Sequence, residues 1–499
     1  MLSTRPAARR QRGVRADLVA GGAALGLVGL ATAIGFAFQV RLHGDPRFPG
    51  APTTFGEWPV LGEWLPHLGP GTPLAVLIAV AAVAWGPPLA ERLPWRRALA
   101  AGYLLAVLWT LSLALVDGWS HGVATRLTTD DEYVSQVPGI TDIPTMLRTF
   151  TDRILDGQPD SWITHVAGHP PGATLIFVWL DRIGLGGGTP AALLCVLISA
   201  ATAAAVPVTI SALGRRDLAR AALPFVALLP GAVWMGVSAD ALFAGVTATG
   251  IALLALGGSR ESPAQSRESP AQDREFAVRN RELRRWNRGL ACWNRGLAGS
   301  PGVRAALCLG AGVLLGFGIF LSYGLVLMSP IALAVIWATR NWRALVLGVL
   351  GALAVVAAFA LAGFWWLDGY HLVVERYHQS IAEFRPYAYW VWADLACLVL
   401  ATGPAAAAGL RRAAPHFHNG LPGRPPAEPV VMLVRAAALA VLTAALSGLS
   451  KAEVERIWLP FAVWLVAGAA LLPASTRRGW LAAGAAVALL VNHLLLTNW

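Results

Sequence analysis

Residues 344–364 read ALVLGVLGALAVVAAFALAGF, a run without a single charged side chain. A helix needs about 20 apolar residues to cross a bilayer, so this stretch predicts a membrane-spanning helix. Runs of the same character recur along the whole chain. The sequence therefore predicts an all-α integral membrane protein with about 13 transmembrane helices, at 16–40, 73–90, 97–116, 188–212, 219–236, 238–257, 304–321, 323–339, 344–364, 388–409, 430–448, 456–473 and 480–497.

The composition excludes several classes of protein. The chain of 499 residues is 56% hydrophobic and only 13% charged, whereas a soluble domain carries about 25% charged residues. An ordinary soluble enzyme, a disordered chain and a disulfide scaffold are therefore excluded. The four cysteines form no CxxC pair and no Cys/His cluster, so we expect no zinc site. The net charge of +11 does not require a nucleic-acid partner, because basic residues mark the cytoplasmic ends of membrane helices.

The distribution of charge predicts how the chain crosses the cell membrane. The N-terminal tail carries Arg5, Arg9, Arg10, Arg12 and Arg15, so we expect it to stay cytoplasmic. Threading the predicted spans from there places most basic residues inside and most acidic residues outside. This predicts a multi-pass protein of the cell membrane with a cytoplasmic N-terminus, an exterior C-terminus and an active site on the exterior face.

Four regions follow from these spans. They are an N-terminal tail with two extra transmembrane helices (1–96), a core with a long exterior loop at 117–169 (97–257), a flexible cytoplasmic insert (258–303), and C-terminal helices with exterior loops at 365–390 and 449–456 (304–499). The insert contains SRESPAQ twice in tandem, at 259–265 and 266–272, which is typical of a flexible segment. The short apolar stretch 170–185 contains charges and is predicted to be a re-entrant or interfacial helix.

Three adjacent carboxylates stand out in the loop 117–169. Asp130, Asp131 and Glu132 follow two threonines and precede Tyr133. Their mutual repulsion raises the pKa of at least one of them if they are desolvated, which suits a general base or a metal site. A solvated acidic turn would have the same sequence.

The rest of that loop leads back to the membrane. Apolar residues at helical spacing between Ile143 and Leu155 predict an amphipathic helix on the outer leaflet. His165 and the sequence His169-Pro170-Pro171-Gly172 follow it. Both histidines are candidates for a functional or a structural role.

Further candidates lie in other exterior segments. Asp240 opens a span, Tyr323 lies in a turn, and the loop 365–390 is dense in aromatic and charged residues. Aromatic rings stack on sugars, and arginine holds phosphate through paired hydrogen bonds, so the candidates in this loop are Arg376, Tyr377, Arg385 and Tyr387. Lys451 and Arg456 are exterior cations, against the positive-inside trend. Salt bridges with Glu453 and Glu455 are their structural alternative.

The order of these features resembles the GT-C superfamily of lipid-linked-sugar glycosyltransferases, and most closely the protein O-mannosyltransferases and bacterial aminoarabinose transferases. The family's Asp-Glu pair in the first exterior loop is matched by Asp131-Glu132. Its Lys/His-Pro-Pro turn is matched by His169-Pro170-Pro171, and Leu321-Ser322-Tyr323-Gly324 looks like its Leu-Thr-Lys-Gly stretch, with Tyr323 where a lysine is common. The resemblance covers roughly residues 97–340.

The resemblance implies a GT-C-like fold and an inverting transfer of a sugar from a polyprenyl-phosphate carrier to a glycan, lipid or protein acceptor. Asp131 is implied as the base, with Glu132 and Asp130 beside it. The phosphate would be held by His165, His169, Arg376, Arg385, Lys451 and Arg456, and the acceptor or sugar by Asp240, Tyr323, Tyr377 and Tyr387. A divalent cation on Asp130, Asp131 and Asp240 is left open. Membrane lipids are expected partners.

Three other functions fit the same residues. A transporter or flippase for lipid-linked glycans would carry charges within the spans and internal repeats. A ligase-like or acyl-transferring membrane enzyme would also use exterior His, Arg and Glu. A scaffold of envelope assembly would leave Asp130 to Glu132 pointing away from His169 and Asp240.

Overall fold

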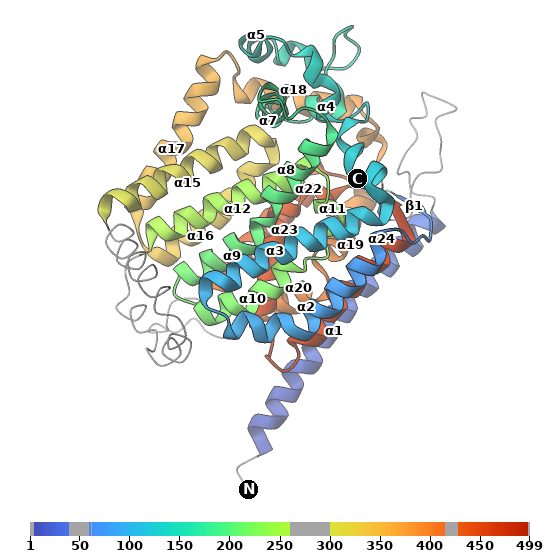
Figure 1. Ribbon diagram of the computed structural model, residues 1–499, viewed down its shortest axis with the longest axis vertical. Coiled ribbons are helices and arrows are strands. Elements are labelled where there is room, and N and C mark those ends of the chain that lie inside the picture. The colour runs from blue at the N-terminus through green and yellow to red at the C-terminus, as the bar shows by residue number, and fades with distance from the viewer. Residues whose placement is uncertain (1–3, 39–58, 61, 260–299, 415–427, 498–499) are drawn as a thin grey trace.

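The computed structural model describes residues 4–38, 59–60, 62–259, 300–414 and 428–497. These residues fold almost entirely into helices joined by short turns (Figure 1). Up to the insert, the elements are α1 (Thr4–Ala37), β1 (Gly62–Trp64), α2 (Thr72–Arg92), α3 (Trp95–Ala114), α4 (Tyr133–Gln136), α5 (Ile143–Arg148), α6 (Thr164–Ala167), α7 (Pro171–Arg182), α8 (Gly188–Ala200), α9 (Thr202–Ala212), α10 (Arg216–Ala227), α11 (Ala232–Met235) and α12 (Ala239–Gly258). After it come α15 (Pro301–Leu321), α16 (Ser329–Thr339), α17 (Trp342–Leu361), α18 (Trp366–Gln379), α19 (Tyr387–Thr402), α20 (Pro404–Ala413), α21 (Pro429–Ser447), α22 (Val454–Ile457), α23 (Leu459–Val466), α24 (Arg477–Leu494) and β2 (Leu495–Thr497).

Within the described residues, eight helices are long and apolar enough to cross a membrane, and a ninth span exists if the bent pair α19–α20 is counted as one. The eight are Gly13–Ala37, Thr72–Arg92, Trp95–Asp117, Gly188–Ala212, Ala239–Gly258, Pro301–Leu321, Trp342–Leu361 and Pro429–Ser447. Each coincides with an apolar run in the sequence. The prediction of an all-α protein with several membrane-spanning helices is therefore confirmed, whereas the count of thirteen is not.

The other predicted spans are apolar for a different reason. The run 219–236 forms α10 and the single turn α11, and α10 with its 12 residues is about 18 Å long against a hydrocarbon core of about 30 Å. The run 388–409 bends by 108° between α19 and α20, where Gly403 has a φ of 73° and precedes a proline. In α23 all eight residues are buried. A helix surrounded by protein is apolar on every side, just as a lipid-facing helix is.

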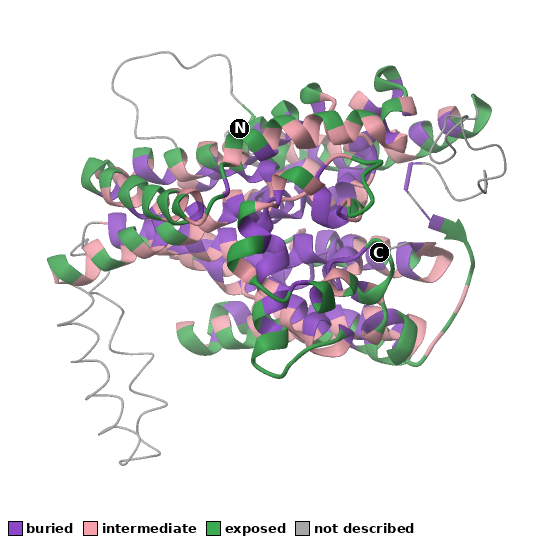
Figure 2. Cartoon of the chain, turned by 90° about the horizontal axis from the view of Figure 1, so that it is seen from above, coloured by how far each residue is buried: buried purple, intermediate pink, exposed green. Residues whose placement is uncertain are grey.

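The surface and the interior of the bundle are both apolar. Large side chains such as Leu77, Trp85, Trp337, Leu361 and Leu446 are exposed on the outer helices, as expected where lipid covers them. Buried residues occupy the middle of the bundle, which Figure 2 shows in purple beneath a mixed outer layer.

Helices α15 and α17 lie unusually close together. A Cβ added at Gly312 would fall 1.9 Å from the backbone oxygen of Gly348, and one at Gly316 would fall 2.7 Å from the Cα of Ala352. The sequence Gly312-x-x-x-Gly316 therefore forms the contact face of α15, as small residues do between membrane helices.

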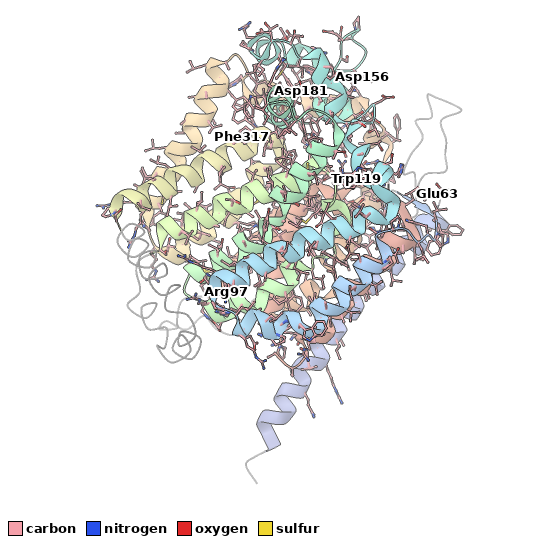
Figure 3. The ribbon with its side chains drawn as sticks, in the orientation of Figure 1. Glu63, Arg97, Trp119, Asp156, Asp181 and Phe317 are labelled. Carbon is pink, nitrogen blue, oxygen red and sulfur yellow. The ribbon has the colours of Figure 1, made fainter. Side chains whose placement is uncertain are left out.

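Basic residues that the sequence predicts to be cytoplasmic gather at one end of the bundle. Arg411 and Arg412 of α20 both pair with the buried Asp17 of α1, at 2.5 and 2.6 Å. Arg220 donates to the backbone carbonyl of Leu93, between α2 and α3. Figure 3 places Arg97 at this end and Asp156 and Asp181 at the opposite end.

The opposite end carries the loops predicted to be exterior. Helices α4, α5, α7 and α18 cluster there (Figure 1). The same region holds β1, which pairs antiparallel with β2 in the register Gly62↔Thr497. His67 after β1 bonds Asp117 at the end of α3, at 2.9 Å.

Two sequence predictions have other outcomes. The amphipathic helix of 143–155 is shorter than predicted, because α5 ends at Arg148 and Phe150 packs inward against Trp162, with ring centroids 5.3 Å apart. Residues 260–299 of the predicted flexible insert, with most of its repeats, lie outside the described part of the chain.

Candidate functional site

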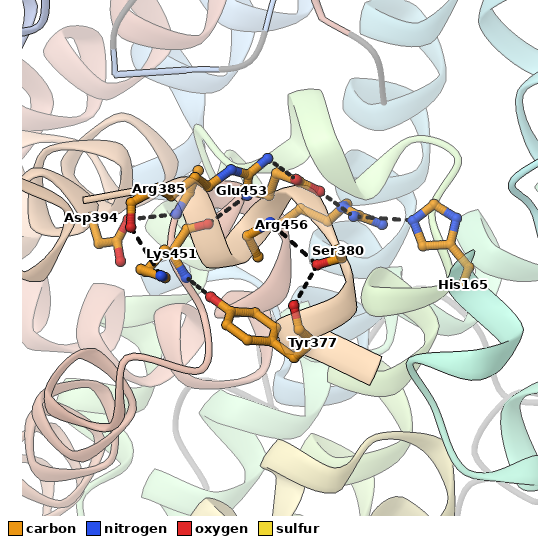
Figure 4. A network of polar contacts seen from close by, with 10 residues as sticks. His165, Tyr377, Ser380, Arg385, Asp394, Lys451, Glu453 and Arg456 are labelled. Carbon is orange, nitrogen blue, oxygen red and sulfur yellow. Dashed lines mark hydrogen bonds and ion pairs between the residues drawn. The ribbon is translucent and has the colours of Figure 1, made fainter. Parts of the chain in front are cut away.

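A chain of charged side chains crosses the end of the bundle where the predicted exterior loops meet. Arg456 Nη1 lies 3.3 Å from Asp240 Oδ2, and Arg456 Nη2 lies 2.9 Å from Glu453 Oε2. The other oxygen of Glu453 accepts a hydrogen bond from Arg385, at 2.9 Å. At the far side, Arg456 Nη2 lies 3.3 Å from His165 Nε2 (Figure 4). Three separate loops and the first turn of α12 thus contribute to one network.

The segment that carries Glu453 and Arg456 has a strained backbone. Ala452 and Glu453 have φ values of 66° and 63°, a left-handed conformation that costs a residue with a Cβ about 1–2 kcal/mol. Asp394 Oδ1 of α19 accepts the Ala452 amide at 3.0 Å, and Glu453 is held by its two arginines. Such strain persists where the surroundings over-determine the backbone, which is common at functional sites.

Opposite charges keep this network ionised although it is buried. Burial alone would raise the pKa of Glu453, but Arg385 and Arg456 outweigh it and lower that pKa to about 2. Burial would lower the pKa of Arg456, but Asp240 and Glu453 raise it above its ordinary value. Both groups are therefore charged throughout the physiological pH range.

The three adjacent carboxylates have different surroundings. Asp130 and Asp131 are exposed, whereas Glu132 is buried. Asp131 Oδ1 accepts a hydrogen bond from the hydroxyl of Thr164 at 3.1 Å. Glu132 Oε1 lies 3.3 Å from His165 Nδ1. Asp131 is thus a carboxylate at the rim of the network, and Glu132 belongs to its interior.

His165 links the acidic loop to Arg456 in one defined tautomer. Its Nδ1 lies 2.7 Å from the backbone oxygen of Asp131, and its Nε2 faces Arg456. An arginine can only donate, so Nε2 must accept and the proton must lie on Nδ1, from where it is donated to the Asp131 carbonyl.

His169 and its two prolines connect the loop to α7. His169 Nδ1 lies 2.8 Å from the His165 carbonyl, and burial lowers the pKa of His169 to about 4, so the ring is neutral. A Cβ at Gly172 would fall 2.5 Å from the backbone oxygen of Phe320. Glycine is therefore required for α7 to begin against the end of α15. Helix α7 has 12 residues, most of them buried, in agreement with a segment that does not cross the membrane.

Lys451 lies beside the network, and none of the carboxylates in the described residues is in hydrogen-bond contact with its side chain. Its Nζ donates to the Arg385 carbonyl at 2.9 Å and lies 5.7 Å from the ring centroid of Tyr377. The hydroxyl of Tyr377 in turn accepts the Lys451 amide at 3.2 Å. Lys451 and Tyr377 are thus part of the same group of residues.

Three predicted site residues make other contacts. Arg376 pairs with the exposed Asp156, at 2.6 Å, and so ties the loop 365–390 to the loop 117–169. Tyr323 packs against Trp366, with centroids 5.3 Å apart. Tyr387 donates to the Leu446 carbonyl and is largely exposed.

No group of three His, Cys, Asp or Glu side chains that could hold a metal ion occurs among the described residues. Asp130, Asp131 and Asp240 are accordingly not gathered into such a group in the described part of the chain. Asp240 has Arg456 as its partner instead.

Two acidic residues of the site were not among the sequence candidates for catalysis or binding. Glu453, considered only as a salt-bridge partner, is the central acid of the network. Asp394 lies within an apolar helix, and a carboxylate at such a position was the available signal.

Comparison with known proteins gives no match: no family model matches the chain, and a search of curated proteins finds no similar one.

Proposed function

We propose that this protein is a membrane glycosyltransferase that moves a sugar from a polyprenyl-phosphate carrier to an envelope acceptor on the exterior face, with inversion at the anomeric carbon. One observation carries the proposal. Carboxylates, histidines and cations from three distant loops converge at one end of an apolar helical bundle, with the exposed Asp131 at the rim of the buried network.

The geometry supports a role for each part. Asp131, at the rim, would accept the proton of the acceptor hydroxyl while that oxygen forms a bond to the anomeric carbon. The bond from that carbon to the phosphate oxygen breaks, and the polyprenyl phosphate leaves with the electron pair. Lys451 would stabilise the negative charge that develops on the leaving phosphate. Its ammonium group is held by a backbone carbonyl and not by a carboxylate, so its positive charge is not neutralised by that partner.

The buried network has a positioning role in this proposal. The charge of Arg456 is balanced by Asp240 and Glu453, so Arg456 orients His165 rather than supplying a positive charge to the substrate. His165 in turn holds the backbone of Asp131. Arg385 fixes Glu453 and the carbonyl of Lys451. The base and the cation are thereby held on a common framework.

The apolar helical bundle is consistent with a sugar donor that reaches the enzyme through the bilayer. A polyprenyl chain is insoluble in water, so its phosphate reaches the enzyme at the membrane surface. The network is formed by loops that join these helices, and the outer helices expose large apolar side chains.

A transporter or flippase for lipid-linked glycans is the second candidate. Asp240 and Asp394 are buried carboxylates within the apolar helices α12 and α19, and charges at such depth are typical of translocation pathways. The two functions differ in whether a covalent product forms.

The decisive experiment is Asp131→Asn in purified protein, assayed with polyprenyl-phosphate mannose, arabinose and glucose. We expect transfer to fall by about 10²–10⁴-fold with donor binding retained. Asp160→Asn is the control, because Asp160 is an exposed carboxylate of the same loop. Unchanged transfer in Asp131→Asn would remove Asp131 from the chemistry. Donor movement across proteoliposomes without a glycosylated product would instead favour the transporter.

A further inference from the structure

Tyr133 is a buried tyrosine within the site that the sequence analysis did not assign. It follows Glu132 and is only 2% exposed. Its ring stacks on His165 and Phe177, with centroids 6.2 and 5.4 Å apart, and meets the edge of His169 at 5.8 Å. Rings on three sides leave this side chain little rotational freedom, so its hydroxyl has a defined position.

The hydroxyl of Tyr133 is buried and has no hydrogen-bond partner among the described residues. A buried tyrosine hydroxyl usually finds one, and leaving it without one costs about 1–3 kcal/mol. Tyr389, which is also buried, illustrates the usual case, because its hydroxyl donates to the Ala31 carbonyl at 2.8 Å.

The groups around this hydroxyl belong to the network. Burial raises the pKa of Tyr133 well above its ordinary value, and the negative charges of Asp240 and Glu132 raise it further, while Arg456 lowers it. The hydroxyl is therefore a permanent donor located among the charged groups of the site. Among the described residues, no acceptor oxygen lies within hydrogen-bond distance of this donor.

We propose that Tyr133 is a substrate-binding residue whose hydroxyl donates a hydrogen bond to an oxygen of the bound glycosyl phosphate. This inference rests on the proposed glycosyltransferase function and adds a contact that selects for an oxygen-bearing ligand. A ligand oxygen at this position satisfies the donor, so part of the cost of burying the hydroxyl in the free protein is recovered when the donor substrate binds.

The test compares Tyr133→Phe with Tyr389→Phe in full-length purified protein. Binding of polyprenyl-phosphate mannose and of unglycosylated polyprenyl phosphate is titrated, and the Tm of each variant is measured without ligand. Removing one hydrogen bond should weaken mannose-donor binding by about 3- to 10-fold in Tyr133→Phe, with an unchanged or higher Tm. Tyr389→Phe should bind the donor like the wild type and have a lower Tm, because the Ala31 carbonyl loses its partner.

The outcomes separate this inference from the function on which it rests. If Tyr133→Phe binds both lipids more weakly to the same extent, the hydroxyl donates to a phosphate oxygen. If it binds only the mannose donor more weakly, the hydroxyl donates to a sugar oxygen. Either result supports the inference. Wild-type affinity in Tyr133→Phe, or a fall in Tm as large as that of Tyr389→Phe, would overturn the inference, while donor binding by the wild type would leave the proposed function in place. A wild-type protein that binds no polyprenyl-phosphate sugar would overturn the proposed function and this inference with it.

Discussion

Arg456 shows how a single residue can join three parts of the chain. Its guanidinium contacts Asp240, Glu453 and His165 and is 5% exposed. Several hydrogen bonds in fixed directions suit arginine better than lysine, because the guanidinium is a planar fork of donors. Removing it would leave the buried Asp240 without its counter-charge and Glu453 with Arg385 as its remaining arginine partner.

Arg456→Met therefore tests the network at the level of one side chain. We expect it to lower the free energy of unfolding by about 3–5 kcal/mol, as for other buried pairs that lose one partner. Arg376→Met is the matched control, because the partner of Arg376 is the exposed Asp156, and such a pair contributes at most about 1 kcal/mol. Thermal unfolding in detergent measures both, and equal shifts would contradict the importance of burial.

Glu455 gives a prediction for pH. The side chain is fully buried, and burial, with the negative charge of Glu453 nearby, raises its pKa to about 7. A glutamate in an unfolded chain titrates near about 4.3. Between these values the unfolded chain has released the proton while the folded protein retains it, so this group makes stability fall as pH rises from about 4.3 to 7.

Glu455→Gln should remove that decrease. The variant is expected to gain stability relative to the wild type on going from pH 5 to pH 8, by an amount on the order of 2 kcal/mol. Glu375→Gln, an exposed glutamate of α18, should leave the pH profile unchanged. The test is the Tm of the wild type and both variants, measured from pH 5 to pH 8. Parallel curves of Tm against pH for the wild type and Glu455→Gln would contradict the prediction.

At the scale of an element, the contact of α15 with α17 depends on glycine. Gly312→Ala should destabilise the protein by about 1–3 kcal/mol, because the added methyl group would meet the backbone of Gly348. Gly310→Ala in the same helix should be neutral or stabilising by up to about 1 kcal/mol, since its nearest neighbour is a side-chain carbon 3.9 Å away. Thermal unfolding of the pair gives the comparison, and a neutral Gly312→Ala would show that α17 can shift away without cost.

Elements also show where sequence reasoning reached its limit. The long runs matched helices because 20 apolar residues have few other stable arrangements. The shorter runs 219–236 and 456–473 were ambiguous, because burial in protein and burial in lipid select the same residues. The spacing from Ile143 to Leu155 was helical, but Phe150 found buried aromatic partners that a local pattern cannot reveal.

For the whole molecule, the two ends of the bundle differ in character. Figure 3 places Arg97 at one end and Asp156 at the other, where α5 also lies (Figure 1), and Asp156 belongs to the loop that carries His165 of the network. Basic residues favour the cytoplasmic side. We therefore expect the end with the network to face the exterior.

Cysteine labelling of intact cells tests this orientation. In a Cys292→Ala background, Gln158→Cys should react with an impermeant maleimide in intact cells, whereas Arg97→Cys should react only after permeabilisation. Both positions are exposed, and Cys195, Cys308 and Cys397 are buried. The opposite labelling pattern would place the network on the cytoplasmic side and remove the exterior acceptor from the proposal.

Composition and spacing alone established a helical membrane protein and the positions of its longest helices, because hydrophobicity and length are properties of a local stretch. They also selected His165, Glu132, Asp240, Arg385 and Arg456 as candidates, since charges near a bilayer are costly and therefore few. Only the tertiary structure decided that these five join one network with Glu453, that Tyr323 and Tyr387 make other contacts, and that Asp131 lies at the rim while Glu132 is buried. Those outcomes depend on contacts between residues up to 291 positions apart, such as His165 with Arg456, and no local pattern encodes which distant loop a side chain will meet.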